Sequence, residues 1–213
     1  MALTVAVTGP TGEIGKPFIR ALERSKDVAK IVGMARRPFD PAAEGWKKVE
    51  YRRGDVLDRA SVDRLCEAAD VVVHLAFILI AGSSDSERIN LEGSRNVFEA
   101  AVAAGAKRLG YASSVAAYGF PELDRPITED DPAAGNERHP YSHHKAEVEA
   151  VLEEVLDDSE TDAYLFRPCI VAGPDAPLFL NSIPFFGLGD RLPGAIRGLF
   201  DQVPILKPVL PDP

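Results

Sequence analysis

LTVAVTGPTGEIGKPFI, residues 3–19, decides the fold of this chain. A largely apolar, β-branched run over residues 3–7 is followed at once by the pattern Gly9-x-x-Gly12-x-x-Gly15, and a helical pattern covers residues 14–25. A glycine-rich turn between a strand and a helix lets backbone amides and the positive helix end hold a phosphate. The stretch therefore predicts a strand, a phosphate-binding turn and a helix.

Each glycine of this turn has its own expected role. Gly9 permits the tight turn, Gly12 lets the backbone approach a pyrophosphate, and Gly15 allows the helix to pack against the strand. A turn without any ligand is the alternative, but its place between strand and helix favours dinucleotide binding. The residues expected to contact the cofactor here are Gly9, Thr11, Gly12, Glu13, Ile14 and Gly15.

The chain continues with short apolar runs that alternate with helical patterns. The predicted strands are 3–7, 31–34, 49–51, 71–75, 108–112 and 163–166, and the predicted helices are 14–25, 60–68, 87–104 and 141–156. This alternation is typical of parallel strands joined by crossover helices. Runs such as 71–73 are apolar at consecutive positions, as expected when helices cover both faces. The predicted fold class is α/β, a Rossmann-type doubly wound parallel sheet.

The pattern changes after Gly173, where prolines interrupt an apolar stretch without clear periodicity. We therefore expect a dinucleotide-binding domain over residues 1–172. Residues 173–213 are expected to begin a small substrate-binding lobe that is truncated in this chain. Residues 119–140 predict a long polar loop, which is often functional, and substrate identity should depend on this loop and on the lobe.

The composition excludes several classes of partner. The net charge is −9 and acidic residues are spread along the chain, so we expect no nucleic-acid binding. No apolar stretch reaches the roughly 18–20 residues of a membrane span, and no signal peptide follows Met1. We therefore expect a cytoplasmic protein without a membrane association. No metal is expected, because no established metal-ligand spacing occurs.

The second predicted strand leads into Arg36 and Arg37, about twenty residues past Gly15. An NAD site usually carries Asp or Glu there, whereas a guanidinium can pair with a 2′-phosphate. We therefore favour NADP over NAD, with Arg36 the first candidate and Arg37 the second. Solvated loop charges are the alternative.

Asp55 and Val56 follow the third predicted strand. An Asp side chain and the following amide can hydrogen-bond an adenine ring, and we expect this contact. The alternative is a helix cap or turn acid, positions that Asp also favours.

Tyr141-Ser142-His143-His144-Lys145 begins the last predicted helix. The spacing of four places the phenol and the ammonium on one helix face. A free tyrosine titrates near pH ~10, so it is a poor base at neutral pH unless nearby cations stabilise its phenolate. Lowering that pKa by about three pH units takes about 4 kcal/mol, which Lys145 and a nicotinamide ring can supply. A surface pair without a role is the alternative.

Several motifs occur in order over residues 3–174 and together resemble one family. They are Thr8 to Gly15, His74-Leu75-Ala76, Asn90-Leu91-Glu92-Gly93, Ser113-Ser114-Val115-Ala116-Ala117-Tyr118-Gly119, Tyr141 to Lys145, and Arg167-Pro168. The chain resembles the extended short-chain dehydrogenase/reductase family, which includes the NAD-dependent epimerase/dehydratase proteins.

The resemblance implies roles for further residues. Ser114 orients the substrate, with Ser113 as the second candidate; Tyr141 and Lys145 carry out the proton chemistry, and Lys145 also holds the nicotinamide ribose. Implied cofactor contacts also include Leu75, Ala76, Phe77, Pro168 and Val171. Asn90 is implied to structure the site through backbone hydrogen bonds, although a helix-entry cap explains it equally well. Phe77 departs from the family, which usually has a small residue there.

The leading hypothesis is an NAD(P)-dependent oxidoreductase that transfers a hydride to or from a small carbonyl or alcohol substrate, with Tyr141 as general acid/base. One alternative is a nucleotide-sugar epimerase or dehydratase that uses tightly bound NAD. Another is a non-catalytic NAD(P)-binding sensor, which the short C-terminal lobe favours. By analogy with such folds, we also expect a homodimer through the helix of Tyr141 and its neighbour at residues 87–104.

Overall fold

The computed structural model describes residues 2–79, 84–121 and 123–171. The described residues up to Ile170 form one compact unit. The lobe predicted over residues 173–213 lies outside the described residues, and its boundary stays a prediction.

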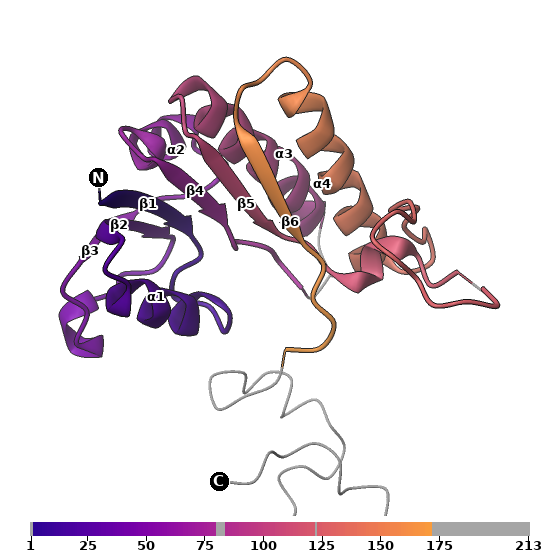
Figure 1. Cartoon of the computed structure of the whole chain (residues 1–213), viewed down its shortest axis with the longest axis horizontal. Helices are drawn as coiled ribbons and strands as arrows, with labels where there is room; N and C mark the ends of the chain where they lie inside the picture. Colours follow the sequence, from indigo (N-terminus) through magenta and orange to yellow (C-terminus); the bar gives the residue numbers. More distant parts are fainter. Residues whose placement is uncertain (1, 80–83, 122, 172–213) are drawn as a thin grey trace, which may run out of the picture. The chain divides into compact units, whose positions relative to one another are not determined.

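Six parallel strands form one sheet in the order β3-β2-β1-β4-β5-β6 (Figure 1). The strands are β1 Leu3–Thr8, β2 Val28–Ala35, β3 Val49–Arg53, β4 Val71–His74, β5 Arg108–Ala112 and β6 Asp162–Phe166. The strand order reverses between β1 and β4, so their carboxyl ends open a crevice of the kind that binds ligands. The predicted doubly wound fold is confirmed.

Helices cover both faces of the sheet, with α1 on one face and α2, α3 and α4 on the other (Figure 1). They are α1 Gly15–Arg24, α2 Arg59–Cys66, α3 Ser84–Ala103 and α4 Pro140–Leu156, with short 3₁₀ helices η1 Pro41–Glu44 and η2 Val115–Tyr118. Val5 and Val7 pack with Ile19 of α1, whereas Ala6 between them joins the core under α2, α3 and α4. Burial on both sides explains the uninterrupted apolar strand runs.

Most predicted elements differ from the observed ones by one to three residues at an end. The largest differences are at β2 and α3, which begin at Val28 and Ser84 rather than at 31 and 87. The polar start of β2 is accommodated because Lys30 forms an ion pair with Glu50 of β3 at 2.6 Å. No helix in the described ranges is long and apolar enough to cross a membrane.

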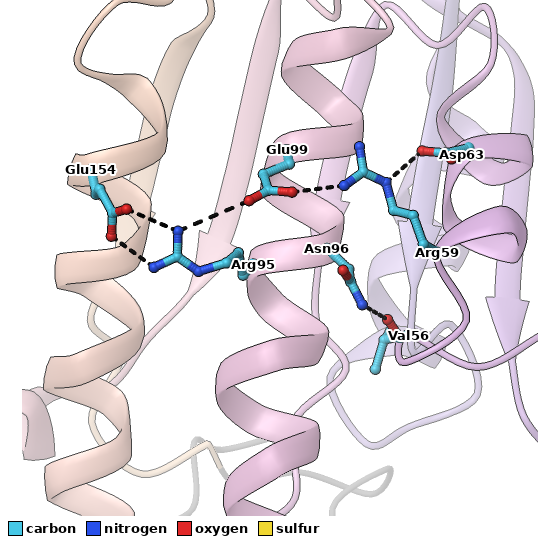
Figure 2. A network of polar contacts seen from close by, with 7 residues as sticks. All are labelled: Val56, Arg59, Asp63, Arg95, Asn96, Glu99 and Glu154. Atoms are coloured by element: carbon cyan, nitrogen blue, oxygen red, sulfur yellow. Dashed lines mark hydrogen bonds and ion pairs between the residues drawn. The ribbon is translucent and has the colours of Figure 1, made fainter.

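Ion pairs connect α2, α3 and α4 across their outer face (Figure 2). Glu154 pairs with Arg95 at 2.7 Å, and Glu99 pairs with Arg59 at 2.7 Å. Such exposed pairs contribute little to stability. The neighbouring Asn96 donates to the carbonyl of Val56 at 2.9 Å and so ties α3 to the chain that follows β3.

The long loop after η2 is closed where it begins and ends. The amide of Gly135 donates to the carbonyl of Ala117 at 2.9 Å, and Asn136 Nδ2 donates to the carbonyl of Gly119 at 3.3 Å. Gly119 and Gly135 both have positive φ, and a Cβ on Gly119 would lie 2.0 Å from the Gly135 oxygen. The two ends therefore meet through a main-chain hydrogen bond, the side-chain amide of Asn136 and the close approach of two glycines.

Candidate active site

A groove of about 340 Å³ opens at the carboxyl ends of β1, β2, β3 and β4. Most of the predicted cofactor contacts meet in its wall. These are Gly9, Thr11, Gly12, Arg36, Arg37, Asp55, Val56, Leu75, Ala76 and Phe77. Glu13, Ile14 and Gly15 belong to the same glycine turn, while Tyr141, Lys145, Pro168 and Val171 do not line the groove.

The three glycines of the turn face different constraints. Gly9 has φ +70°, and a Cβ there would lie 2.9 Å from the amide nitrogen of Ala76. A Cβ on Gly15 would lie 2.1 Å from the oxygen of Gly9, whereas one on Gly12 would meet the same oxygen at 3.4 Å. The protein itself therefore requires glycine at 9 and 15 but has room for a methyl group at 12.

The start of α1 offers hydrogen-bond donors. Within the described part of the chain, the backbone amides of Ile14 and Gly15 have no acceptor, and Ile14 receives no side-chain cap. Free amides at a helix start, next to a glycine cradle, suit the negative charge of a pyrophosphate. The turn thus fits the phosphates of a dinucleotide.

A buried hydrogen-bond chain fixes the segment after β4, which forms one wall of the groove. Ser94 Oγ donates its only hydrogen to the carbonyl of Asn90, so His74 Nε2 must donate to Ser94 Oγ, at 2.9 Å. His74 Nδ1 then accepts from Thr8 Oγ1 at 2.7 Å. Burial, together with the charge of Lys145, lowers the pKa of His74 to about 3. The neutral tautomer is therefore set by its neighbours.

Asn90 continues this chain toward the groove. Its Oδ1 accepts from the amide of Ile78 at 2.8 Å, and its Nδ2 donates to the carbonyl of Ile78 at 3.1 Å. Thr8 Oγ1 also accepts from the amides of Leu75 and Ala76 at 3.1 and 3.2 Å. Asn90 lies inside α3, so the helix-entry cap is wrong and its role is to hold the groove wall.

Arg36 and Arg37 are exposed after the end of β2, and in the described ranges neither guanidinium has an ion-pair partner. Both therefore remain available to an anion in the groove. Asp55 accepts from the amide of Leu57 at 3.0 Å through one carboxylate oxygen, as expected of a turn acid. Its other oxygen has no partner among the described residues.

Lys145 is buried, with 3% of its surface exposed. Its Nζ donates to the carbonyl of Ala112 at 2.7 Å and to Tyr111 Oη at 3.3 Å. Burial lowers the pKa of Lys145 to about 7, although the carboxylate of Glu149 opposes this change. The ammonium therefore loses its proton far more readily than a surface lysine does.

Phe77 lies where the groove meets Tyr141 and Lys145. Its ring lines the groove, packs edge-on against Tyr141 with centroids 5.7 Å apart, and covers Lys145 Nζ at 3.6 Å from its centroid. The large residue thus separates the lysine from the groove in this structure. Tyr141 and Lys145 lie together as predicted from their spacing, with Nζ 5.8 Å from the Tyr141 ring centroid.

The two serines after β5 differ in their hydrogen bonds. Ser113 Oγ donates to the carboxylate of Glu149. Ser114 Oγ accepts from the amide of Ala116 at 3.2 Å, and its own hydrogen has no acceptor among the described residues. Ser114 therefore retains a donor for a substrate oxygen, which supports it over Ser113.

Pro168 and Val171 follow β6. The carbonyl of Pro168 accepts from the amide of Val115 at 3.1 Å, which ties this segment to η2. Val171 is exposed and is the last described residue. Their contact with a nicotinamide stays a prediction.

The model of the NAD dependent epimerase/dehydratase family matches residues 5–184. This chain belongs to that family. Ceramide reductase of Caulobacter vibrioides is 30% identical over 173 residues, which are 80% of this chain and 47% of that protein. UDP-glucose 4-epimerase 2 of Arabidopsis thaliana is 27% identical over 183 residues, 78% of this chain and 51% of that protein.

A solved structure of a short-chain dehydrogenase/reductase superfamily protein from Agrobacterium tumefaciens, with bound NAD, is 27% identical. Its TM-score is 0.66, and the match covers 77% of this chain and 48% of that chain. This chain thus spans about half the length of these proteins. The membership in the NAD dependent epimerase/dehydratase family confirms the resemblance drawn from the motifs.

Two features of the site were not predicted from the sequence. They are the hydrogen bonds of Thr8 and Ser94 to His74 and the contact of Glu149 with Ser113. Thr8 and Ser94 orient His74 from positions 66 residues before it and 20 after it. Glu149, which contacts Ser113, was detectable because it lies four residues after Lys145 and so shares its helix face.

Proposed function

We propose that this chain binds a nicotinamide dinucleotide in the groove and acts as an NAD(P)-dependent oxidoreductase on a carbonyl or alcohol of a small molecule. The glycine turn is the observation that carries the proposal, because its cradle excludes side chains at Gly9 and Gly15 and the amides of Ile14 and Gly15 have no acceptor among the described residues. Phe77 lines this groove and packs against Tyr141 and Lys145, so the pair lies next to the groove, behind this ring.

The proposed chemistry divides between the cofactor and three side chains. When bound, the nicotinamide exchanges a hydride with the substrate carbon. In the direction of reduction, Tyr141 gives a proton to the substrate oxygen, and in oxidation it removes that proton. Ser114 donates a hydrogen bond to the same oxygen with the hydroxyl hydrogen that no described residue accepts.

Lys145 can support both the tyrosine and a ribose. A protonated lysine has three donors, and two of them are used by Ala112 and Tyr111. The third remains for the cofactor ribose or the Tyr141 oxygen once Phe77 moves away from Nζ. With a pKa near 7, Lys145 holds charge at or below neutral pH and loses it above.

We also propose that NADP binds more tightly than NAD. Arg36 and Arg37 line the groove and are unpaired among the described residues, and the end of β2 provides no carboxylate for ribose hydroxyls. A guanidinium bound to a 2′-phosphate is expected to favour NADP by about tenfold at low salt, and Arg36→Ala should abolish the preference.

Calorimetric titration with NADP and NAD tests the proposal. Arg24→Ala is the matched control, since Arg24 is exposed in the last turn of α1 and does not line the groove. Loss of the preference in Arg36→Ala but not in Arg24→Ala supports the phosphate clamp. Equal affinities in the unmodified chain would exclude it, and no binding of either dinucleotide would exclude the function itself.

Epimerisation or dehydration of a nucleotide sugar is the second candidate, favoured by the match to UDP-glucose 4-epimerase 2. The same residues would oxidise and then reduce one substrate without net redox change. Tight retention of NAD distinguishes it: purified protein that releases a stoichiometric dinucleotide on acid treatment supports this candidate. A freely exchanging cofactor with NADPH consumption on carbonyl compounds supports the oxidoreductase, and binding without any turnover supports a sensor.

We keep a homodimer through α3 and α4 as a proposal. The outer face of these helices carries the ion pairs of Arg95, so an interface there would be polar (Figure 2). Sedimentation velocity on the chain and on Arg95→Glu tests it. A dimer that dissociates in the variant supports this face, and a monomer at all concentrations excludes it.

A further inference from the structure

Glu149 is a buried carboxylate that the proposed chemistry does not use. Only 2% of its surface is exposed. It accepts from Ser113 Oγ and from two nitrogens of Arg167, with Nε to Oε1 at 3.1 Å and the terminal nitrogen to Oε2 at 2.7 Å. A buried charge needs such partners, and here they come from the ends of β5 and β6.

The network continues into η2. The other terminal nitrogen of Arg167 donates to Tyr118 Oη at 2.9 Å, and the guanidinium lies 4.6 Å from the Tyr118 ring centroid. Ser113 precedes Ser114, which caps η2. One carboxylate on α4 therefore joins the three elements that surround the proposed catalytic groups.

Other titratable groups surround the same space. Lys145 precedes Glu149 by one helical turn, and Tyr141 precedes Lys145 by another. Tyr111 of β5 and His74 of β4 pack on the sheet side, with ring centroids 5.7 Å apart. Burial raises the pKa of Tyr111, and the Glu149 charge adds to this effect, so the phenol stays neutral. With His74 also neutral, the charge that acts on Lys145 among the described residues is that of Glu149, and Arg167 is paired with this carboxylate.

We propose that Glu149 is a positioning residue for the centre formed by Ser114, Tyr141 and Lys145. It fixes the end of β5 against α4 through Ser113 and balances the buried ammonium, while Arg167 neutralises part of its charge. The importance of this network for turnover rests on the proposed function, but the network itself can be tested without substrate or cofactor.

The test is an NMR titration of the Lys145 side chain in the isotope-labelled chain, with the signal assigned by Lys145→Arg. Glu149→Gln removes the negative charge, so the midpoint should fall by about one pH unit. Arg167→Gln leaves the Glu149 charge uncompensated, so the midpoint should rise. Glu153→Gln is the control, because Glu153 is exposed on the same helix.

Shifts of opposite sign are the diagnostic result, because general loosening of the structure would move both midpoints the same way. Unchanged midpoints in both variants, or shifts of one sign, overturn the proposal. If Glu149→Gln does not fold, Arg167→Gln is compared with Arg167→Lys, which keeps a positive charge beside Glu149. A rise of the midpoint in Arg167→Gln but not in Arg167→Lys supports the proposal, and equal midpoints in the two variants overturn it. Dinucleotide affinity measured in parallel separates a failure of this network from a failure of the proposed function.

Discussion

The glycine turn after β1 and the centre around Lys145 are built by different means. The turn depends on backbone: close approaches at Gly9 and Gly15, and helix-start amides that have no acceptor among the described residues. The centre depends on side chains that carry charge out of water, chiefly Lys145 and Glu149. Substitutions in the turn should therefore act by steric clash. Substitutions in the centre should change the pKa of Lys145 and the way in which stability depends on pH.

The largest effect is expected from Gly15→Ala. Its new Cβ would lie 2.1 Å from the Gly9 oxygen, so the turn and α1 must move apart. Such overpacking against rigid backbone should lower the free energy of unfolding by about 3 kcal/mol. Urea unfolding measures this. Stability equal to that of the unmodified chain would show that the turn is not sterically determined.

Lys145→Met should change how stability depends on pH. Because burial lowers the pKa of Lys145 from its usual 10.5 to about 7, the unfolded chain binds more protons between these values. The free energy of unfolding should therefore rise with pH across this window, by up to about 1 kcal/mol per pH unit. Lys145→Met should remove that rise, and Lys26→Met, at an exposed position, should preserve it. A parallel pH dependence in all three proteins would contradict a buried ammonium.

Gly12→Ala separates ligand sterics from protein sterics. A Cβ at 3.4 Å from the Gly9 oxygen is tolerated, so unfolding should change by less than about 1 kcal/mol. Dinucleotide affinity should fall at least about tenfold, because the methyl group occupies the path of the pyrophosphate. Calorimetry measures this affinity. If Gly12→Ala binds the dinucleotide as tightly as the unmodified chain does, the dinucleotide does not bind at this turn.

Phe77→Ala tests the residue that contacts both regions, since Phe77 lines the groove and its ring covers Lys145. Removing the ring 3.6 Å from Nζ admits water to Lys145, so its pKa should rise from about 7, by about one pH unit. The same NMR titration measures it. An unchanged midpoint would mean that the ring contributes little to the burial of the ammonium.

The smallest effect is expected from Glu154→Gln on the outer face of α4 (Figure 2). Its side chain is 65% exposed, so water and salt screen the pair with Arg95. Stability should be nearly unchanged, in contrast with Glu149→Gln five residues earlier. Urea unfolding of the two variants measures this. Equal losses in the free energy of unfolding would show that the buried and the exposed carboxylate contribute alike to stability.

The glycine turn could be predicted from the sequence, because its geometry is set by residues close together in the chain. The spacing of Gly9, Gly12 and Gly15 sets the turn, and consecutive apolar residues in β4 predict burial on both faces. The pairing of Tyr141 with Lys145 also follows from a helix period. The burial of Lys145 under Phe77 could not be predicted, because it depends on contacts between residues far apart in the sequence.

The Glu149 network could not be predicted either, because it also joins residues that are far apart in the sequence. Ser113 lies 36 residues before Glu149, and Arg167 lies 18 after it. No periodicity relates three residues on different elements, since only the packing of α4 on the sheet brings them together. The exact ends of β2 and α3 were also missed, because neighbouring strands and helices decide where each element begins.

The closure of the long loop at Gly119 and Gly135 bears on how freely this loop can vary. The two ends of the long loop meet through a main-chain hydrogen bond, the Asn136 side chain and the close approach of two glycines, so we expect the closure to depend little on the residues between them. We therefore expect that the loop can be exchanged, lengthened or shortened while Gly119 and Gly135 keep its ends together. Grafting this loop between relatives would test the prediction that it decides which substrate is accepted.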